Sequence, residues 1–193
     1  YLTNGIAMLA NWEQYAPEGS SAEEVGEFVS NQFPGALTWK DIEKFRQLWT
    51  GNLVLKGVMR VDDALRAAEV GVDGLMISNH GARQLDRAPA PLDVLPAIDA
   101  AVGDRMTLML DGGVRRGADI MIALCLGAKF VFVGRPTLYG CIAGGQLGAT
   151  KAVEIVRSEI ETNMKQLGCP ALDQLGPDFL HWDIDEARKN MRA

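Results

Sequence analysis

Cysteine and histidine are scarce in this sequence, with three Cys and two His in 193 residues. The cysteines, Cys125, Cys141 and Cys169, are widely spaced, and none belongs to a CxxC pair or to a cluster with metal-ligand spacing. The sequence therefore predicts neither a disulfide framework nor a bound metal ion. Free cysteines at this low frequency fit a reducing cytoplasm best.

Long hydrophobic runs and an excess of positive charge are also missing. No stretch approaches the roughly 20 apolar residues that span a bilayer, and the first residues lack the pattern of a signal peptide. The net charge of −6 excludes a general attraction to nucleic acid or to anionic membrane. Any anion site must therefore be built from locally gathered basic residues, for which Arg115, Arg116 and Arg135 are candidates.

Apolar residues are plentiful, at 48% of the chain, which predicts a soluble globular unit with a sizeable core. Short apolar runs alternate with helical patterns, which predicts four strands, each followed by a helix. The runs are nearly continuous in apolar residues, as is typical of parallel strands covered on both faces. They are LVLKGV (53–58), GLMISN (74–79), TLMLDGG (107–113) and FVFVGRP (130–136).

Further helices are expected on both sides of these units. Two precede them, at 20–33 with Ser20 or Ser21 as the N-cap and at 37–49 with Thr38 as the N-cap. A long amphipathic helix follows, from Leu138 to Leu167. The predicted organisation is an insertion or lid with its helices at 1–52, four βα units with the C-terminal helix at 53–178, and a tail at 179–193.

Four βα units make only half of a β/α barrel, which needs eight. Half a barrel exposes strand edges, so we expect either a partner half or a longer enzyme of which this chain, which begins at Tyr1, is a part. A doubly wound open sheet is the alternative. Its phosphate loop would follow the first strand, whereas the glycine-rich turns here follow the third and fourth.

Residues suited to chemistry stand at the ends of all four predicted strands, where β/α barrels carry their active sites. An imidazole titrates near neutrality and suits a general base, a guanidinium matches a carboxylate, and a strand-end ammonium needs an anion or an electron-rich partner. Ordinary polar strand ends, common glycine turns and a lysine reaching solvent are the alternative interpretations. The residues are Lys56, His80 with Arg83, Asp111 with Gly112 and Gly113, and Gly134 with Arg135.

The stretch ISNHGARQLD (77–86) closely resembles the SNHGGRQLD signature of the FMN-dependent α-hydroxy-acid dehydrogenase and oxidase family. The resemblance extends from about Leu53 to Asp178, and Ala82 stands where the family usually has glycine. It implies an α/β fold, the C-terminal half of an FMN-binding TIM (β/α)8 barrel, with the four strands as the fifth to the eighth. It also implies oxidation of an L-2-hydroxy acid to the 2-keto acid.

The resemblance assigns roles to individual residues. It makes His80 the base, Arg83 the ligand of the substrate carboxylate, and Lys56 the charge beside the flavin ring, with Ser78 bonded to that ring. LDGGVRRG and FVFVGRP resemble the paired phosphate-binding loops of FMN barrels. They add Asp111, Gly112, Gly113, Arg115, Gly134 and Arg135 to the expected cofactor site.

Within the family the chain is most similar to the mandelate dehydrogenase and lactate dehydrogenase branch, near the glycolate oxidases. We expect a homotetramer when the barrel is complete and no nucleic-acid partner. The segment LTNGIAMLANW (2–12) is interpreted as a lid, with a monotopic contact to the inner face of a membrane as the alternative. Alternative functions are another FMN or phosphate-binding barrel enzyme, such as an isomerase or inosinate-type dehydrogenase, and a catalytically silent half-barrel that binds a phosphate ligand or a partner chain.

Overall fold

The structure, a computed structural model, describes residues 8–32 and 37–181 and divides into two compact units, Tyr1–Phe45 and Arg46–Ala193. Leu2, Ile6 and most of the predicted tail at 179–193 lie outside the described residues. The predicted boundaries after residues 52 and 178 stay predictions.

The first unit contains α1 (Ala10–Glu13), α2 (Ala22–Gln32) and most of α3 (Trp39–Leu48). A capping box starts α2, because the Ser21 N–H donates to Glu24 Oε2 (2.7 Å) and the Glu24 N–H donates to Ser21 Oγ (3.3 Å). Ser21, and not Ser20, is therefore the cap of the two that the sequence allowed. Thr38 precedes α3, and its N–H and hydroxyl both donate to Asp41 Oδ2.

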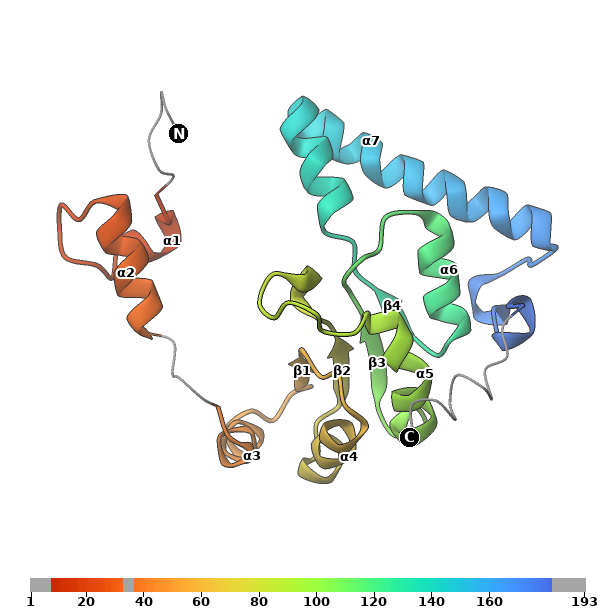
Figure 1. Ribbon diagram of the computed structural model, residues 1–193, viewed down its shortest axis with the longest axis horizontal. Helices are drawn as coiled ribbons and strands as arrows, with labels where there is room; N and C mark the ends of the chain where they lie inside the picture. The colour runs from red at the N-terminus through yellow and green to blue at the C-terminus, as the bar shows by residue number, and fades with distance from the viewer. Residues whose placement is uncertain (1–7, 33–36, 182–193) are drawn as a thin grey trace. The chain divides into compact units, whose positions relative to one another are not determined.

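The second unit contains the predicted four βα units, with the strands in the order β1-β2-β3-β4 and all pairs parallel (Figure 1). This confirms the predicted alternation, since each of the first three strands is followed by a helix that returns the chain to the next strand. The elements in order are β1 (Val54–Lys56), α4 (Val61–Val70), β2 (Gly74–Ile77), α5 (Pro91–Val102), β3 (Thr107–Leu110), α6 (Gly117–Cys125) and β4 (Phe130–Val131).

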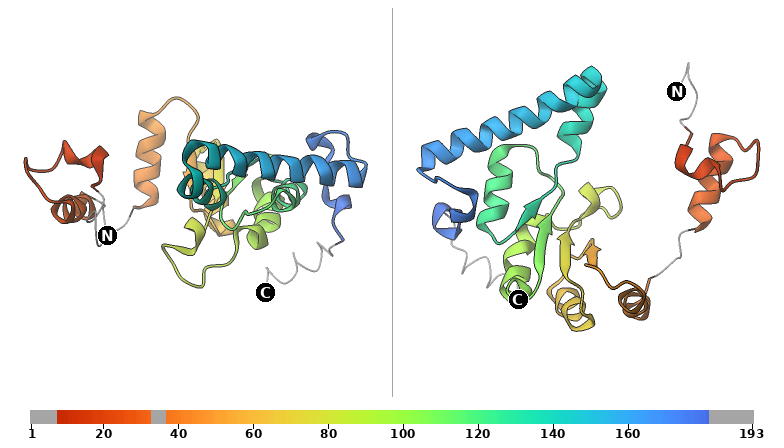
Figure 2. Two further views of the ribbon diagram at one scale, coloured as in Figure 1. Left: turned by 90° about the horizontal axis from the view of Figure 1, so that it is seen from above. Right: turned by 180° about the vertical axis from the view of Figure 1, so that it is seen from behind.

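The two faces of this sheet differ in burial. The face toward the helices holds the core, in which Leu75, Ile77, Leu108 and Leu110 are at most 1% exposed. Alternation along the strands places Val54, Met76, Met109 and Phe130 on the other face. Val54 is 40% and Phe130 56% exposed. The expectation of strands covered on both faces is therefore wrong for the described residues, since helices cover one face only (Figure 2).

The last helix, α7 (Arg135–Leu167), starts earlier than predicted and is broken at Gly144 and Gly145, where φ and ψ are not helical. The two segments fold back on each other at Gly140 and Gly148, since a Cβ at either glycine would overlap the carbonyl oxygen of the other. The second segment runs past α6 (Figure 1). Among the described residues, no helix has the length and apolar character needed to cross a membrane.

Candidate active site at the strand ends

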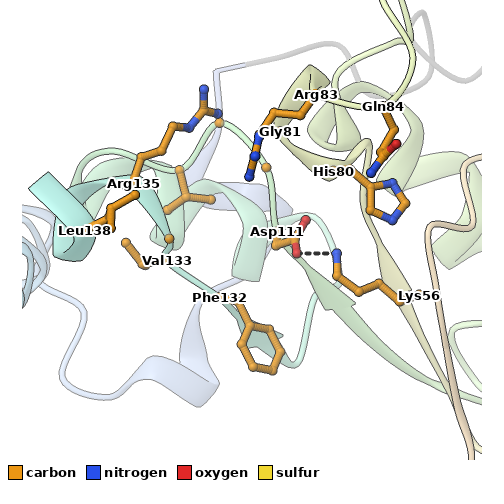
Figure 3. Close-up of a pocket in the computed structure, with 14 residues that line it drawn as sticks. Lys56, His80, Gly81, Arg83, Gln84, Asp111, Phe132, Val133, Arg135 and Leu138 are labelled. Atoms are coloured by element: carbon orange, nitrogen blue, oxygen red, sulfur yellow. Dashed lines mark hydrogen bonds and ion pairs between the residues drawn. The ribbon is translucent and has the colours of Figure 1, made fainter. Parts of the chain in front are cut away.

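A cavity of about 560 Å³ lies at the C-terminal ends of the four strands (Figure 3). Its volume falls within the range of small-molecule and cofactor sites. The last residue of β1, the loops after β2, β3 and β4, and the first turn of α7 line it. They are Lys56, His80, Gly81, Arg83, Gln84, Asp111, Gly112, Gly113, Val114, Phe132, Val133, Gly134, Arg135 and Leu138.

Three strand ends are joined through Ser78, the buried polar residue of the site, which is 1% exposed. Lys56 Nζ donates to Ser78 Oγ and to Asp111 Oδ2, both at 2.7 Å. The Ser78 hydroxyl donates in turn to Asp111 Oδ1 and accepts the N–H of His80 at 3.1 Å. All the bonding positions of the hydroxyl are thus used, and Ser78 fixes Lys56 relative to Asp111.

The loop after β2 carries the residues of the predicted signature through an unusual backbone. His80, Gly81 and Ala82 have φ of 55°, 67° and 60°, so three successive residues adopt the left-handed conformation. For a residue with a Cβ this conformation costs about 1–2 kcal/mol. Such strain persists only where neighbouring interactions hold it, and it is concentrated at functional sites.

Two glycines allow close approaches between the loops. Gly57 has φ 95°, and a Cβ there would lie 2.9 Å from His80 Cε1, so the imidazole packs directly against the end of β1. Gly112 has φ 93°, and a Cβ there would lie 2.8 Å from Asn79 Oδ1. Side chains at either position would push the loops after β2 and β3 out of place.

The helices that follow the two glycine turns begin differently. The amides at the start of α6 are occupied. Glu159 Oε2 accepts the N–H of Gly117, the first residue, and Asp119 Oδ2 accepts those of Arg115 and Arg116 just before it. No side chain caps the start of α7, and Arg135 at that start lines the cavity. Pro136 at the second position has no N–H, but the uncapped N–H of Arg135 can bind an anion together with its guanidinium. The α7 end of the cavity is therefore the one suited to a phosphate.

The charges around the cavity favour an anion, although the whole chain is acidic. Lys56, Arg83 and Arg135 line it with one carboxylate, Asp111, so cations outnumber acids three to one. A Cβ at Gly113 or Gly134 would meet no atom within 4 Å, which leaves both backbones accessible. Open backbone amides beside arginine are the donor set that a phosphate monoester requires.

Most of the predicted site residues come together here. Eight line the cavity, and Ser78 forms hydrogen bonds to three of them. Arg115 is not among the lining residues, and the guanidinium of Arg116 forms an ion pair with Glu159 at 2.9 Å. The eight are Lys56, His80, Arg83, Asp111, Gly112, Gly113, Gly134 and Arg135.

The sequence interpretation missed several residues of the site. Phe132, Val133 and Leu138 line the cavity, and Gly57 and Asn79 pack against lining residues. Leu138 follows Arg135 by three residues, so helical spacing was a usable signal. Asn79 lies within the signature stretch 77–86, but the sequence interpretation gave it no role. In residues 8–32 and 37–181 no group of three or more His, Cys, Asp or Glu is arranged to hold a metal ion.

Comparison with known proteins places this geometry in context. The family described as FMN-dependent dehydrogenase matches residues 3–182. A peroxisomal (S)-2-hydroxyacid oxidase of Arabidopsis thaliana is 44% identical over 167 residues, covering 86% of this chain and 45% of the relative. An L-lactate oxidase of Nostoc sp. is 46% identical over 154 residues, covering 80% of this chain and 42% of the relative.

A solved structure agrees in shape. The crystal structure of the monotopic membrane protein (S)-mandelate dehydrogenase has a TM-score of 0.85 and 37% sequence identity, covering 94% of this chain and 48% of the other. The chain thus spans about half the length of the proteins that it matches. Half of a β/α barrel, as the sequence predicted, accounts for this coverage and for the sheet with one covered face.

Proposed function

The chain belongs to the FMN-dependent dehydrogenase family, and from that membership and its site we propose that it supplies the catalytic half of an enzyme that oxidises an L-2-hydroxy acid to the 2-keto acid. One observation carries the proposal. His80 and Arg83 come from one turn after β2 and line a cavity. The Lys56–Asp111 ion pair lies in the same cavity, at the ends of the flanking strands β1 and β3.

The residues of the cavity fit FMN as the cofactor. The guanidinium and N–H of Arg135 and the Gly112–Gly113 backbone would hold its phosphate, while Lys56 and Asp111 would lie toward its ring. No GxGxxG sequence follows a strand, which argues against a dinucleotide. When bound, FMN supplies the acceptor for the two electrons that leave the substrate.

His80 acts as the base that removes a proton from the substrate. A neutral imidazole is suited to this role near pH 7, and the ring packed on Gly57 is held at the edge of the cavity. Arg83 binds the substrate carboxylate with its planar fork of donors. This pairing orients the substrate so that its 2-hydroxyl faces His80.

Lys56 provides fixed positive charge that stabilises negative charge as it develops at the ring. Its ammonium is already oriented by Ser78 and Asp111, each at 2.7 Å. A charge that needs no reorientation during the reaction stabilises the transition state more than one that must move. Arg115, which the sequence assigned to the phosphate, would act from outside the residues that line the cavity.

The partner of this chain is a first half that supplies four more strands. The exposed Val54 and Phe130 on the uncovered face of the sheet and the unpaired edges of β1 and β4 support this, because a closed barrel leaves neither. The substrate is a small 2-hydroxy carboxylate of the mandelate or lactate type. The complete barrel forms a homotetramer, which light scattering would measure.

A peripheral membrane contact is the second part of the partner proposal. Met8 and Leu9 in the first unit are 37% and 45% exposed, and a monotopic membrane protein is among the structural relatives. Residues 2–12 would then dock on lipid and not serve as a lid. Co-sedimentation with lipid vesicles, compared between the protein and a Leu9→Glu variant, separates the two roles.

The proposed function is tested by the flavin spectrum of the protein purified with its barrel complement. The expected result is a bound FMN whose visible absorbance bleaches anaerobically on addition of mandelate or lactate. Bound FMN without bleaching by any 2-hydroxy acid favours another FMN barrel enzyme. No flavin and no turnover leaves a half-barrel that binds other ligands, and either result rejects the proposal.

A further inference from the structure

Asn79 is not among the residues that line the cavity, and the proposed function gives it no role, yet three parts of the site meet at its side chain. We propose that Asn79 is a positioning residue that holds His80 and Arg83 in place and links their loop to the turn at Gly112. The inference rests on the proposed function for its catalytic consequence, but the geometry behind it does not.

The left-handed turn is held by the two residues that precede it. Each of its three N–H groups has a partner there: the His80 N–H donates to Ser78 Oγ at 3.1 Å. The Gly81 N–H donates to Asn79 Oδ1 at 3.0 Å, and the Ala82 N–H donates to the Asn79 carbonyl at 3.0 Å. Two of the three bonds therefore end on Asn79, so Asn79 carries the larger share of holding an unfavourable backbone.

The other end of the same amide closes the loop that carries Arg83. Asn79 Nδ2 donates to the Pro89 carbonyl at 3.2 Å, across ten residues of sequence. Arg83 and Gln84, which line the cavity, lie within the segment so enclosed. With both ends of the amide bonded, the start of the turn and the end of the loop are tied to one side chain.

The amide also packs beneath the neighbouring turn. A Cβ at Gly112 would lie 2.8 Å from Asn79 Oδ1 and 3.1 Å from the Pro91 Cγ. The backbone of Gly112 therefore rests on Asn79 and Pro91, and a displacement of the amide would reach the loop after β3. Asn79 thereby connects the base to the turn that we assign to the cofactor.

The two ends of the amide are separable by substitution. Asn79→Ala removes both the acceptor for Gly81 and the donor to Pro89. Asn79→Asp keeps the acceptor for Gly81 and replaces the donor to Pro89 by a charged carboxylate oxygen, which the Pro89 carbonyl repels. The positioning role predicts that the alanine variant displaces His80, whereas the aspartate variant retains the turn and mainly loosens the part of the loop that carries Arg83.

The test uses the two histidines of the chain, His80 and His181. The chain is labelled with [13C]histidine and combined with an unlabelled first half of the barrel, so that only two ring signals are recorded by NMR. In Asn79→Ala the His80 signal is expected to move while that of His181 stays. Turnover per bound flavin should fall about 10- to 100-fold, as expected for a base displaced by about 1 Å.

The control is Asn31→Ala, on the exposed surface of α2, which should change neither signal nor turnover. Asn79→Asp should keep the His80 signal near its position and raise KM more than it lowers kcat. If Asn79→Ala does not fold, the KM and kcat of Asn79→Asp alone test the positioning role.

Unchanged His80 signal and turnover in Asn79→Ala, or unchanged KM and kcat in Asn79→Asp, would overturn the proposal. A loss of flavin occupancy with unchanged turnover per bound flavin would reduce Asn79 to a structural role and also overturn it. If the unaltered protein oxidises no hydroxy acid, the proposed function fails, and the His80 signal alone decides whether Asn79 positions the ring.

Discussion

Individual residues of the site take their roles from the groups that hold them. Lys56 ends a strand of apolar residues, where an ammonium without a partner would be unfavourable. Ser78 and Asp111 provide that partner at 2.7 Å, from strands that lie 22 and 55 residues further along the chain. His80 and Arg83 line the cavity, so the effect of each on turnover and on substrate binding can be measured by a single substitution.

Replacement of His80, the proposed base, and of Arg83, the proposed carboxylate ligand, should have different kinetic effects. His80→Asn should lower kcat about 10²- to 10⁴-fold, the usual contribution of general base catalysis, while flavin stays bound. Arg83→Ala should weaken carboxylate binding by about 1.5–3 kcal/mol, the strength of a charge-assisted hydrogen bond. Steady-state kinetics with mandelate and lactate would measure both, and full turnover in His80→Asn would remove it as the base.

The backbone at Ala82 is strained, and a glycine there should relieve the strain. Its φ of 60° is unfavourable for a residue with a Cβ by about 1–2 kcal/mol, and the greater freedom of unfolded glycine offsets part of this. Ala82→Gly is therefore expected to raise the free energy of unfolding by up to about 1 kcal/mol. Urea unfolding would measure it, with Ala118→Gly inside α6 as a control that should destabilise. A fall in stability for Ala82→Gly would contradict the strain.

Strands and helices set the distances between these residues. The end of β1 makes room for the loop after β2 only because residue 57 has no side chain. Similar contact occurs where α7 folds back at Gly140 and Gly148, and where α6 starts against α7 at Gly117. Close packing between elements thus depends on the absence of a Cβ at specific positions.

Gly57→Ala should displace the imidazole. The new Cβ would lie 2.9 Å from His80 Cε1, so the ring must move, and a shift of about 1 Å costs about a hundredfold in turnover. Gly19→Ala is the matched control, because Gly19 also has a positive φ, of 82°, but a Cβ there meets no atom within 4 Å. Equal effects of the two variants on kcat would show that backbone strain, and not contact with His80, is responsible.

The interactions of Asp73 with Arg46 and Leu53 should weaken in acid. Asp73 Oδ2 accepts the Leu53 N–H at 2.7 Å and pairs with Arg46 at 2.8 Å. The Leu53 N–H, followed by Arg46, holds the pKa of the Asp73 carboxyl below its usual range. Because the folded-state pKa is the lower one, the stabilisation is complete above the unfolded value of about 4 and is lost as pH falls through the folded one.

Urea midpoints measured from pH 7 down to pH 2 should reveal this pH dependence. Asp73→Asn is expected to be less stable than the unaltered protein at pH 7, and the difference should shrink below pH 4 as the native carboxyl protonates. Asp104→Asn, at an exposed position in the turn before β3, is the control. If the difference in stability between the unaltered protein and Asp73→Asn stays constant with pH, the lowered pKa of Asp73 is contradicted.

The second unit has the architecture of half a β/α barrel. One face of its sheet is buried beneath helices, and the other exposes Val54, Phe130 and Phe132 by 40–56%. At about 25 cal/mol per Å² of apolar surface removed from water, covering that face stabilises the assembly. The first half of the barrel, which we propose as the partner, would provide that cover.

Without that complement, the chain should bind flavin poorly and should not turn over. Unpaired strand edges also favour association, so we expect pairing with the first half, pairing with a second copy, or insolubility. Mixing with a separately expressed first half should restore quenching of flavin fluorescence and activity together. A monodisperse monomer of the 193-residue chain with full activity would contradict the half-barrel, and light scattering with an activity assay would detect it.

The sequence by itself determined the four βα units, the family and most residues of the site. Apolar runs fix strands because burial drives them, and the stretch from Ser78 to Arg83 holds three of the predicted site residues within six positions. Only the tertiary structure decided that α7 is broken and that Asn79 and Gly57 support His80. These features depend on contacts between residues far apart in sequence, and on backbone angles that residue types alone do not specify.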